Sequence, residues 1–98
     1  MPGVRKLRAV RAIVRPDRRD EYLGCWRRYA SAADAAGARV QLFEDQVLPG
    51  RFLELTEHEA AQGMELALER AVQEAELRRS CVRREGDDVL YREVTLDA

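Results

Sequence analysis

The sequence predicts an α+β domain in which four strands and two helices follow one another as strand–helix–strand–strand–helix–strand. Apolar residues alternate with polar ones along four short segments, as in half-buried strands. They recur at three- and four-residue steps along two longer segments, as in amphipathic helices. Glycine and proline stand between most of these segments, where turns are needed. At 98 residues the chain has the size of one domain, which we expect to span residues 1–98.

The first strand is predicted over residues 7–15, and Pro16 ends it because proline has no N–H to donate to a neighbouring strand. Asp17 then occupies the N-cap position of a helix that runs to about Ala36, and Gly37 is its stop. Along the strand, Val10, Ala12 and Val14 share one face, and Arg11, Ile13 and Arg15 share the other. The apolar stripe of the helix consists of Tyr22, Cys25, Trp26, Tyr29 and Ala33.

A hairpin is predicted next, with strands over residues 38–47 and 51–57. Pro49 fixes φ in the turn between them and Gly50 permits a positive φ. In the first strand Val40 and Leu42 point one way while Gln41 and Phe43 point the other; in the second, Leu53 and Leu55 share a face opposite Phe52, Glu54 and Thr56.

A second helix is predicted from near Glu59 to Arg83, followed by a turn over residues 85–88 and a short strand over residues 89–94. This order of elements is the split β-α-β pattern of ferredoxin-like folds. It predicts a four-stranded antiparallel sheet with both helices on one face. The apolar stripe of the second helix consists of Met64, Leu68, Ala71, Val72 and Ala75.

The sheet face without helices is expected to pair with a second copy of the chain. It mixes aromatic and polar side chains, a composition found at protein–protein contacts, and pairing by symmetry removes an exposed patch. The alternative is a monomer with one solvated sheet face, which antiparallel sheets tolerate. We assign to this face Arg11, Ile13, Gln41, Phe43, Phe52, Glu54, Thr56, Val89 and Tyr91, and expect Glu54 to meet an arginine such as Arg11.

The composition excludes several classes of partner. With 17 basic and 18 acidic side chains the net charge is −1, so no overall field attracts nucleic acid or an acidic membrane. The arginines of residues 5–19 protect a strand edge in our interpretation. Cys25 and Cys81 lack a CxxC partner, and no His/Cys/Asp set has metal-binding spacing, so we expect free thiols and no metal. Without an apolar run of signal or membrane-span length, we expect a cytoplasmic protein.

Two stretches resemble a known family. VRAIVRPDRRDEYLGCWRRYA, residues 10–30, is similar to the opening of antibiotic-biosynthesis-monooxygenase-like domains, where a strand, a short turn and an aromatic-bearing helix follow one another. LFEDQVLPGRFLELTEHE, residues 42–59, is similar to the central hairpin of the same family and to soluble domains attached to some transporters of the major facilitator class. The resemblance covers nearly the whole chain and implies a ferredoxin-like fold and a dimeric α/β barrel.

The resemblance also implies a range of chemistry. Some relatives oxidise aromatic polyketides without metal or cofactor, some degrade haem, and many have no known activity. In the enzymes an asparagine, a tryptophan and a histidine or tyrosine often line a pocket between sheet and helices. This chain has no asparagine, Trp26 lies on the first helix rather than at the end of the third strand, and His58 replaces the aromatic residue after Thr-Glu. The haem-degrading set therefore does not map, and we expect no cofactor.

The candidate site residues each have a structural alternative. His58, the only histidine, is the candidate acid–base group because its usual pKa lies near neutrality; the alternative is an ion pair with its flanking glutamates. Trp26 and Tyr29, with Met64 and Tyr91, are the candidate binding residues for a flat aromatic ligand. The alternative for the aromatic stripe is packing of the helix on the sheet.

Two functions follow from these residues. One is the cofactor-independent oxidation, or the binding, of a small aromatic or polycyclic compound in a pocket under the helices. The other is a non-catalytic dimeric module for ligand binding or interaction. The volume between the sheet and the first helix separates them, because a cavity of several hundred cubic ångströms favours the first and a filled interior favours the second.

Overall fold

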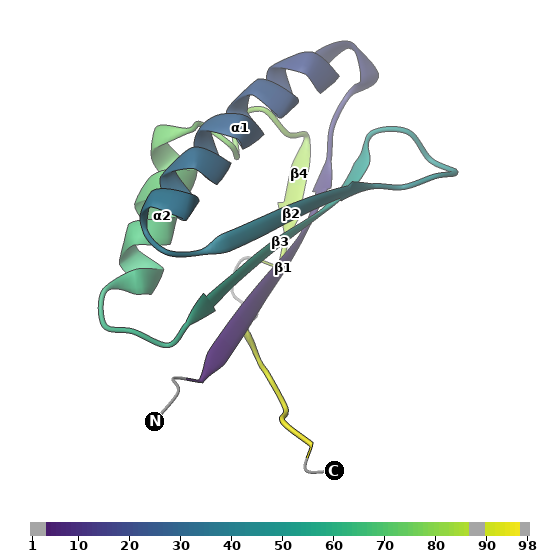
Figure 1. Cartoon of the computed structure of the whole chain (residues 1–98). Coiled ribbons are helices and arrows are strands. Elements are labelled where there is room, and N and C mark those ends of the chain that lie inside the picture. The colour runs from purple at the N-terminus through teal and green to yellow at the C-terminus, as the bar shows by residue number, and fades with distance from the viewer. Residues whose placement is uncertain (1–3, 87–89, 97–98) are drawn as a thin grey trace.

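The computed structural model describes residues 4–86 and 90–96 and forms two layers, with helices against one face of an antiparallel sheet (Figure 1). The confirmed fold class is the ferredoxin-like α+β class. The elements are β1 (Arg5–Ile13), the 3₁₀ turn η1 (Pro16–Arg18), α1 (Arg19–Ala35), β2 (Arg39–Glu44), β3 (Arg51–Glu59), α2 (Met64–Glu74), β4 (Arg83–Glu85) and β5 (Leu90–Arg92).

The sheet has the order β2-β3-β1-β4, and β5 also pairs with β1. Strand β3 occupies one edge of β1 along residues 5–13. The other edge is therefore shared, with β4 opposite residues 11–13 and β5 opposite residues 6–8. The fourth strand of the predicted sheet thus consists of two short pieces, of which only β5 falls within the predicted strand.

The predicted second helix was too long at both ends. Strand β3 continues to Glu59, and Gly63 precedes α2 with a φ of 83°. At the other end Glu76 has a φ of 57°, and the Leu77 N–H donates to the Val72 carbonyl at 3.2 Å. A left-handed residue with this hydrogen bond ends a helix in the manner of a Schellman motif. The chain then turns, which allows Arg83–Glu85 to pair with β1 instead of extending α2.

The predicted N-cap of the first helix was also wrong. Pro16 begins the turn η1, since proline is favoured in the first turn of a helix, and α1 starts only at Arg19. The Asp17 carboxylate caps neither element; it accepts hydrogen bonds from the Arg15 guanidinium at 3.2 Å.

The register between β1 and β3 shows which side of β3 faces the helices. Phe52 lies opposite Ala12, and Glu54 lies opposite Val10. Residues directly opposite each other in an antiparallel pair share a face. Ala12 and Val10 are buried beneath the helices, so Phe52, Glu54 and Thr56 are buried there too, with exposed fractions of 4%, 2% and 5%.

Our assignment of those three residues to the open face was therefore wrong. Leu53 and Leu55 lie on the open face instead, opposite Arg11 and Ala9. The alternation predicts which residues share a face, but the apolar side of β3 is the one without helices, and so hydrophobicity alone favours the wrong choice. The other predicted open-face residues of the described chain, Arg11, Ile13, Gln41, Phe43 and Tyr91, do lie there; Val89 lies outside the described residues.

The aromatic stripe of α1 packs into the core, as its structural alternative predicted. Tyr22, Trp26 and Tyr29 are all buried. The Tyr22 ring lies 4.7 Å from the ring of Phe52, and the rings of Trp26 and Tyr29 are 5.3 Å apart. The predicted stripe of α2 faces the same core through Leu68, Ala71 and Val72.

A glycine closes the connection between β2 and β3. Gly50 has a φ of 87°, and its carbonyl accepts a hydrogen bond from the Val14 N–H at 2.7 Å. A Cβ added at Gly50 would collide with the Val14 carbonyl oxygen, so both the conformation and the space require glycine.

Gly50→Ala is expected to lower the free energy of unfolding by about 2 kcal/mol or more, because the side chain strains the backbone and collides with Val14. Gly24 in α1 is the matched control: no atom lies within 4 Å of its added Cβ. Gly24→Ala is expected to stabilise the protein by up to about 1 kcal/mol. Urea denaturation of both variants measures the difference, and equal stabilities would contradict this account of Gly50.

Candidate functional site

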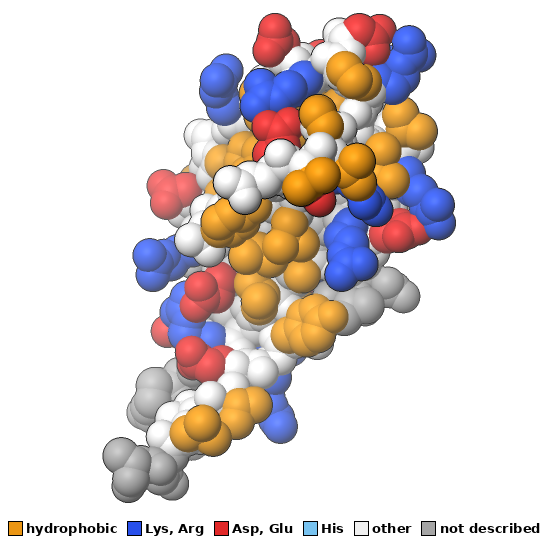
Figure 2. All heavy atoms as spheres, turned by 90° about the vertical axis from the view of Figure 1, so that its right-hand side faces the viewer, with side chains coloured by type: hydrophobic (Ala, Val, Ile, Leu, Met, Phe, Trp, Pro, Cys, Tyr) orange, Lys and Arg blue, Asp and Glu red, His pale blue; other side chains and the backbone are white. Residues whose placement is uncertain are grey.

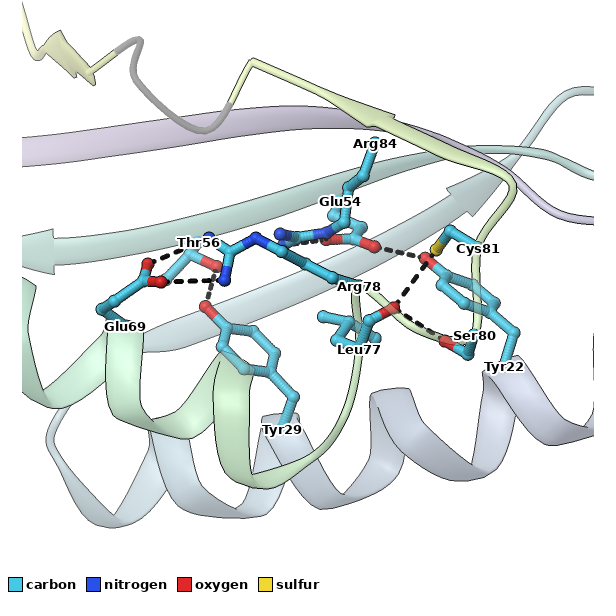
Figure 3. A network of polar contacts seen from close by, with 10 residues as sticks. All are labelled: Tyr22, Tyr29, Glu54, Thr56, Glu69, Leu77, Arg78, Ser80, Cys81 and Arg84. Atoms are coloured by element: carbon cyan, nitrogen blue, oxygen red, sulfur yellow. Dashed lines mark hydrogen bonds and ion pairs between the residues drawn. The ribbon is translucent and has the colours of Figure 1, made fainter.

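A cluster of polar side chains lies buried between the sheet and the helices (Figure 3). The Glu54 carboxylate is at its centre. Its Oε1 accepts hydrogen bonds from Nη2 and Nε of Arg84 at 2.7 and 3.1 Å, and its Oε2 accepts one from the Tyr22 hydroxyl at 2.6 Å. The Glu54 and Arg84 side chains are 2% and 7% exposed. The expected pairing of Glu54 with Arg11 was therefore wrong, because the two lie on opposite faces of the sheet.

The ion pair spans three strands. Arg84 of β4 lies opposite Ala12 of β1, while Glu54 of β3 lies opposite Val10 of β1. The Arg84 side chain must therefore cross β1 to reach the carboxylate. Ala12 has only a methyl group on this face, which leaves room for that crossing. The pair thus joins β4 to β3 in addition to the backbone hydrogen bonds that join β4 to β1.

The environment keeps Tyr22 protonated. Burial raises the pKa of the Tyr22 hydroxyl far above its usual range, and the negative charge of Glu54 raises it further. Tyr22 is thus a permanent donor to Glu54. With Arg84 on one carboxylate oxygen and Tyr22 on the other, both oxygens of Glu54 accept hydrogen bonds within the protein.

A second group of polar contacts lies beside the first. The hydroxyls of Tyr29 and Thr56 are 2.6 Å apart and share a hydrogen bond. Arg78 pairs with Glu69 of α2 at 2.8 Å and lowers the pKa of that carboxyl. A void of about 10 Å³ lies among these groups, next to Glu54. This is the space of a single water molecule.

The interior under the helices is therefore filled. Every buried side-chain nitrogen and oxygen of residues 4–86 and 90–96 has a hydrogen-bond partner. Ligand pockets have volumes of roughly 300–1,000 Å³. In this structure the predicted pocket between sheet and helices is closed.

His58 lies inside this layer and not on the surface. It is 2% exposed, sits opposite Lys6 of β1, and shares the helix-covered face of β3 with Thr56. Its Nδ1 is 2.9 Å from the carbonyl oxygen of Glu59. This contact fixes the orientation of the imidazole ring, which the candidate role as an acid–base group requires.

The predicted binding residues are only partly brought together. Trp26 and Tyr29 pack against each other in the core, and Met64 lies at the edge of that core. Tyr91 does not join them. It is opposite Leu7 on the open face and is 54% exposed, because the two pieces of the fourth strand place it on the other side of the sheet.

A broad hollow lies on the open face, the side of the molecule that Figure 2 shows. It has a volume of about 470 Å³ and is bounded by the end of the sheet that carries the β2–β3 connection. Its residues are Arg11, Ala12, Ile13, Phe43, Glu44, Asp45, Arg51, Phe52, Leu53, Arg83 and Glu85.

Sequence reasoning missed three residues of the buried cluster, namely Arg84, Tyr22 in its role as a donor, and Thr56. One signal was available for the third strand: Glu54 is the only acid among the alternating residues that share its face. A lone acid on a buried strand face demands a basic partner. The identity of that partner was hidden because Arg84 was assigned to the region just after a helix.

Within residues 4–86 and 90–96 no cluster of three or more histidine, cysteine, aspartate or glutamate side chains is placed to hold a metal ion. Over the same residues no helix combines the length and the apolar character needed to cross a membrane.

The fold is shared with two solved structures. The first is described as a "Putative antibiotic biosynthesis monooxygenase from Nitrosomonas europaea"; it has 16% sequence identity and a TM-score of 0.75, covering 96% of this chain and 94% of that one. The second, with the same description, comes from Chloroflexus aurantiacus J-10-fl; it has 16% identity and a TM-score of 0.66, covering 97% and 95%. The resemblance noted in the sequence is thus confirmed at the level of the fold. The sequence matches no protein-family model and no curated protein.

Glu54→Gln is expected to lower the free energy of unfolding by about 3–5 kcal/mol, because it removes the negative charge from a buried, hydrogen-bonded pair with Arg84. Glu21→Gln is the control. It breaks an exposed pair between Glu21 of α1 and Arg18 of η1 and should cost less than about 1 kcal/mol. Urea denaturation monitored by Trp26 fluorescence compares the two, and a Glu54→Gln variant as stable as the control would show that the pair contributes little.

Proposed function

We propose that the chain is a self-pairing module with a monooxygenase-like fold, a homodimeric α/β barrel in which two sheets meet through their open faces. The observation that carries this proposal is the apolar character of a sheet face that no described helix covers (Figure 2). Large apolar side chains on that face remain exposed in the single chain: 38% for Ile13, 51% for Phe43, 37% for Leu53 and 54% for Tyr91.

These side chains are neighbours and not scattered. Leu53 lies between Arg11 on β1 and Phe43 on β2, and Leu55 lies beside Leu53 on the same face. Contiguous exposed apolar surface on a sheet marks an interaction site. A second copy of the same face supplies a matching surface, and a two-fold axis closes the assembly at two chains.

The filled interior supports a binding or pairing role over catalysis. A domain of this size buries only roughly 60–65% of its unfolded-chain surface, so its own core is modest and association adds to it. The aromatic side chains that could have lined a pocket, Trp26 and Tyr29, instead build that core. Pairing of the open faces needs no cavity under the helices.

Leu53→Asp tests the pairing, because it places a charge in the middle of the proposed interface. The natural chain is expected to have about twice its single-chain mass of 11.2 kDa at micromolar concentration, and the variant is expected to have the mass of one chain. Leu66→Asp is the matched control, since Leu66 is 62% exposed on α2, in the helical layer. Sedimentation or light scattering measures the masses, and a monomeric natural chain would falsify the proposal.

A second candidate is cofactor-independent oxidation of a small aromatic or polycyclic compound. It is favoured by the oriented, buried imidazole of His58 in the same layer as the hydroxyls of Tyr29 and Thr56. A flat phenolic substrate carries the electrons that reduce oxygen, so the protein needs to supply a dry site and one proton acceptor. In this candidate α2 moves to admit the substrate.

Oxygen uptake with a polycyclic phenol, in the presence of a metal chelator, tests this candidate. His58→Gln keeps the size of the side chain but removes the proton acceptor, and it is expected to lower kcat by about 10²-fold or more. Tyr91→Phe on the open face is the control and should retain the full rate. If the natural chain and His58→Gln consume oxygen equally, His58 is not the base.

A further inference from the structure

The connection between β2 and β3 presents two aliphatic side chains to solvent. Val47 and Leu48 are 81% and 48% exposed. The connection, residues 45–50, projects away from the helices, toward the side of the open sheet face (Figure 1). We call it the hairpin tip. Core packing does not explain the valine and the leucine at the hairpin tip, since neither side chain packs into the core.

The hairpin tip is held in one shape. The Asp45 carboxylate accepts hydrogen bonds from the N–H groups of Val47 and Leu48 at 2.7 and 2.9 Å. At its base the Gly50 carbonyl accepts from the Val14 N–H at 2.7 Å. A contact made by such a preformed tip costs little ordering entropy.

The hollow beside the tip has complementary chemistry. Its apolar surface comes from Ile13, Phe43 and Leu53, and its volume of about 470 Å³ accommodates aliphatic side chains. Among the described residues, the Arg11 guanidinium at this hollow makes no hydrogen bond or ion pair within the chain. The hairpin tip begins with Asp45, whose Oδ1 is used within the tip while its Oδ2 makes no hydrogen bond among the described residues. Glu44, just before the tip, is already paired with Arg19.

If only the sheet faces pair, the Arg11 guanidinium is covered without gaining a hydrogen-bond acceptor. A guanidinium removed from water without an acceptor is strongly unfavourable. A second copy that brings its hairpin tip to the hollow supplies Asp45 Oδ2 as an acceptor for Arg11, and Val47 and Leu48 as apolar side chains for Phe43 and Leu53. This argument selects a second copy of the chain as the occupant of the hollow.

The area of the interface supports the same conclusion. At ~3.3 Å per residue and ~4.8 Å between strands, the five strands cover roughly 480 Å² in flat projection. A standard interface buries ~800 Å² on each partner. Two protruding tips, each seated in the hollow of the other copy, add the contact that flat sheets lack.

We infer that, in the proposed dimer, the hairpin tip of each copy is seated in the open-face hollow of the other. The inference rests on the proposed pairing and goes beyond it by naming the contact that sets the arrangement of the two copies. Because tip and hollow belong to the same chain, a two-fold axis satisfies both at once, and the exchange closes at two copies.

Cross-linking between two different variants tests the contact directly. Leu48→Cys chains are mixed with Leu53→Cys chains and oxidised, so that a disulfide between the two introduced thiols can form only between copies. A mixed cross-linked dimer, identified by mass spectrometry of the joined peptides, is expected. The control mixes Leu66→Cys with Leu53→Cys, which places one thiol on α2; cross-linking no better than this control overturns the inference.

A second measurement keeps the inference separate from the pairing itself. Val47→Asp is expected to raise the dissociation constant of the dimer by tenfold or more, while Leu66→Asp leaves it unchanged. If the natural chain is a dimer and Val47→Asp dimerises equally well, the tip lies outside the interface and only this inference fails. If the natural chain is a monomer in the same sedimentation experiment, the proposed pairing fails first.

Discussion

The buried ion pair between Glu54 and Arg84 is the constraint on which the arrangement of the sheet depends. Two charges removed from water are tolerated only where hydrogen bonds satisfy them, and here Tyr22 completes the partners of the carboxylate. Because the pair reaches from β3 across β1 to β4, it fixes the position of the outer strand. It also requires the even-numbered side chains of β3 to face the helices.

Because of that requirement, polar side chains of β3 lie on its buried face while leucines lie on its open face. The side beneath the helices carries Glu54, Thr56 and His58, all buried, while the open side carries Leu53 and Leu55. A strand that hides its charge and exposes its leucines is costly for an isolated chain, since leucine burial is the main source of stability. The cost disappears if another surface covers the leucines, and this links the buried ion pair to the proposed pairing of the open faces.

The elements themselves could be predicted because each depends on local signals. Alternation along β1, the aromatic stripe of α1 and the proline and glycine before β3 placed these elements to within a few residues. The end of α2 could not be predicted, since Glu76 in a left-handed conformation has no distinctive sequence signal. The partner of Glu54 could not be predicted either, because β4 exists only through its pairing with β1 and the crossing over Ala12 is a tertiary contact.

The same network indicates where the interior could admit a ligand. The void beneath α2 holds about 10 Å³, so any ligand there requires a movement. Releasing Glu54 breaks a fully buried pair, whereas releasing α2 breaks the Arg78–Glu69 pair, whose side chains are 42% and 34% exposed. Pairs of the second kind are weak. A movement of α2 that breaks the Arg78–Glu69 pair therefore leaves the Glu54–Arg84 pair in place, and it opens the void beside the hydroxyls of Tyr29 and Thr56.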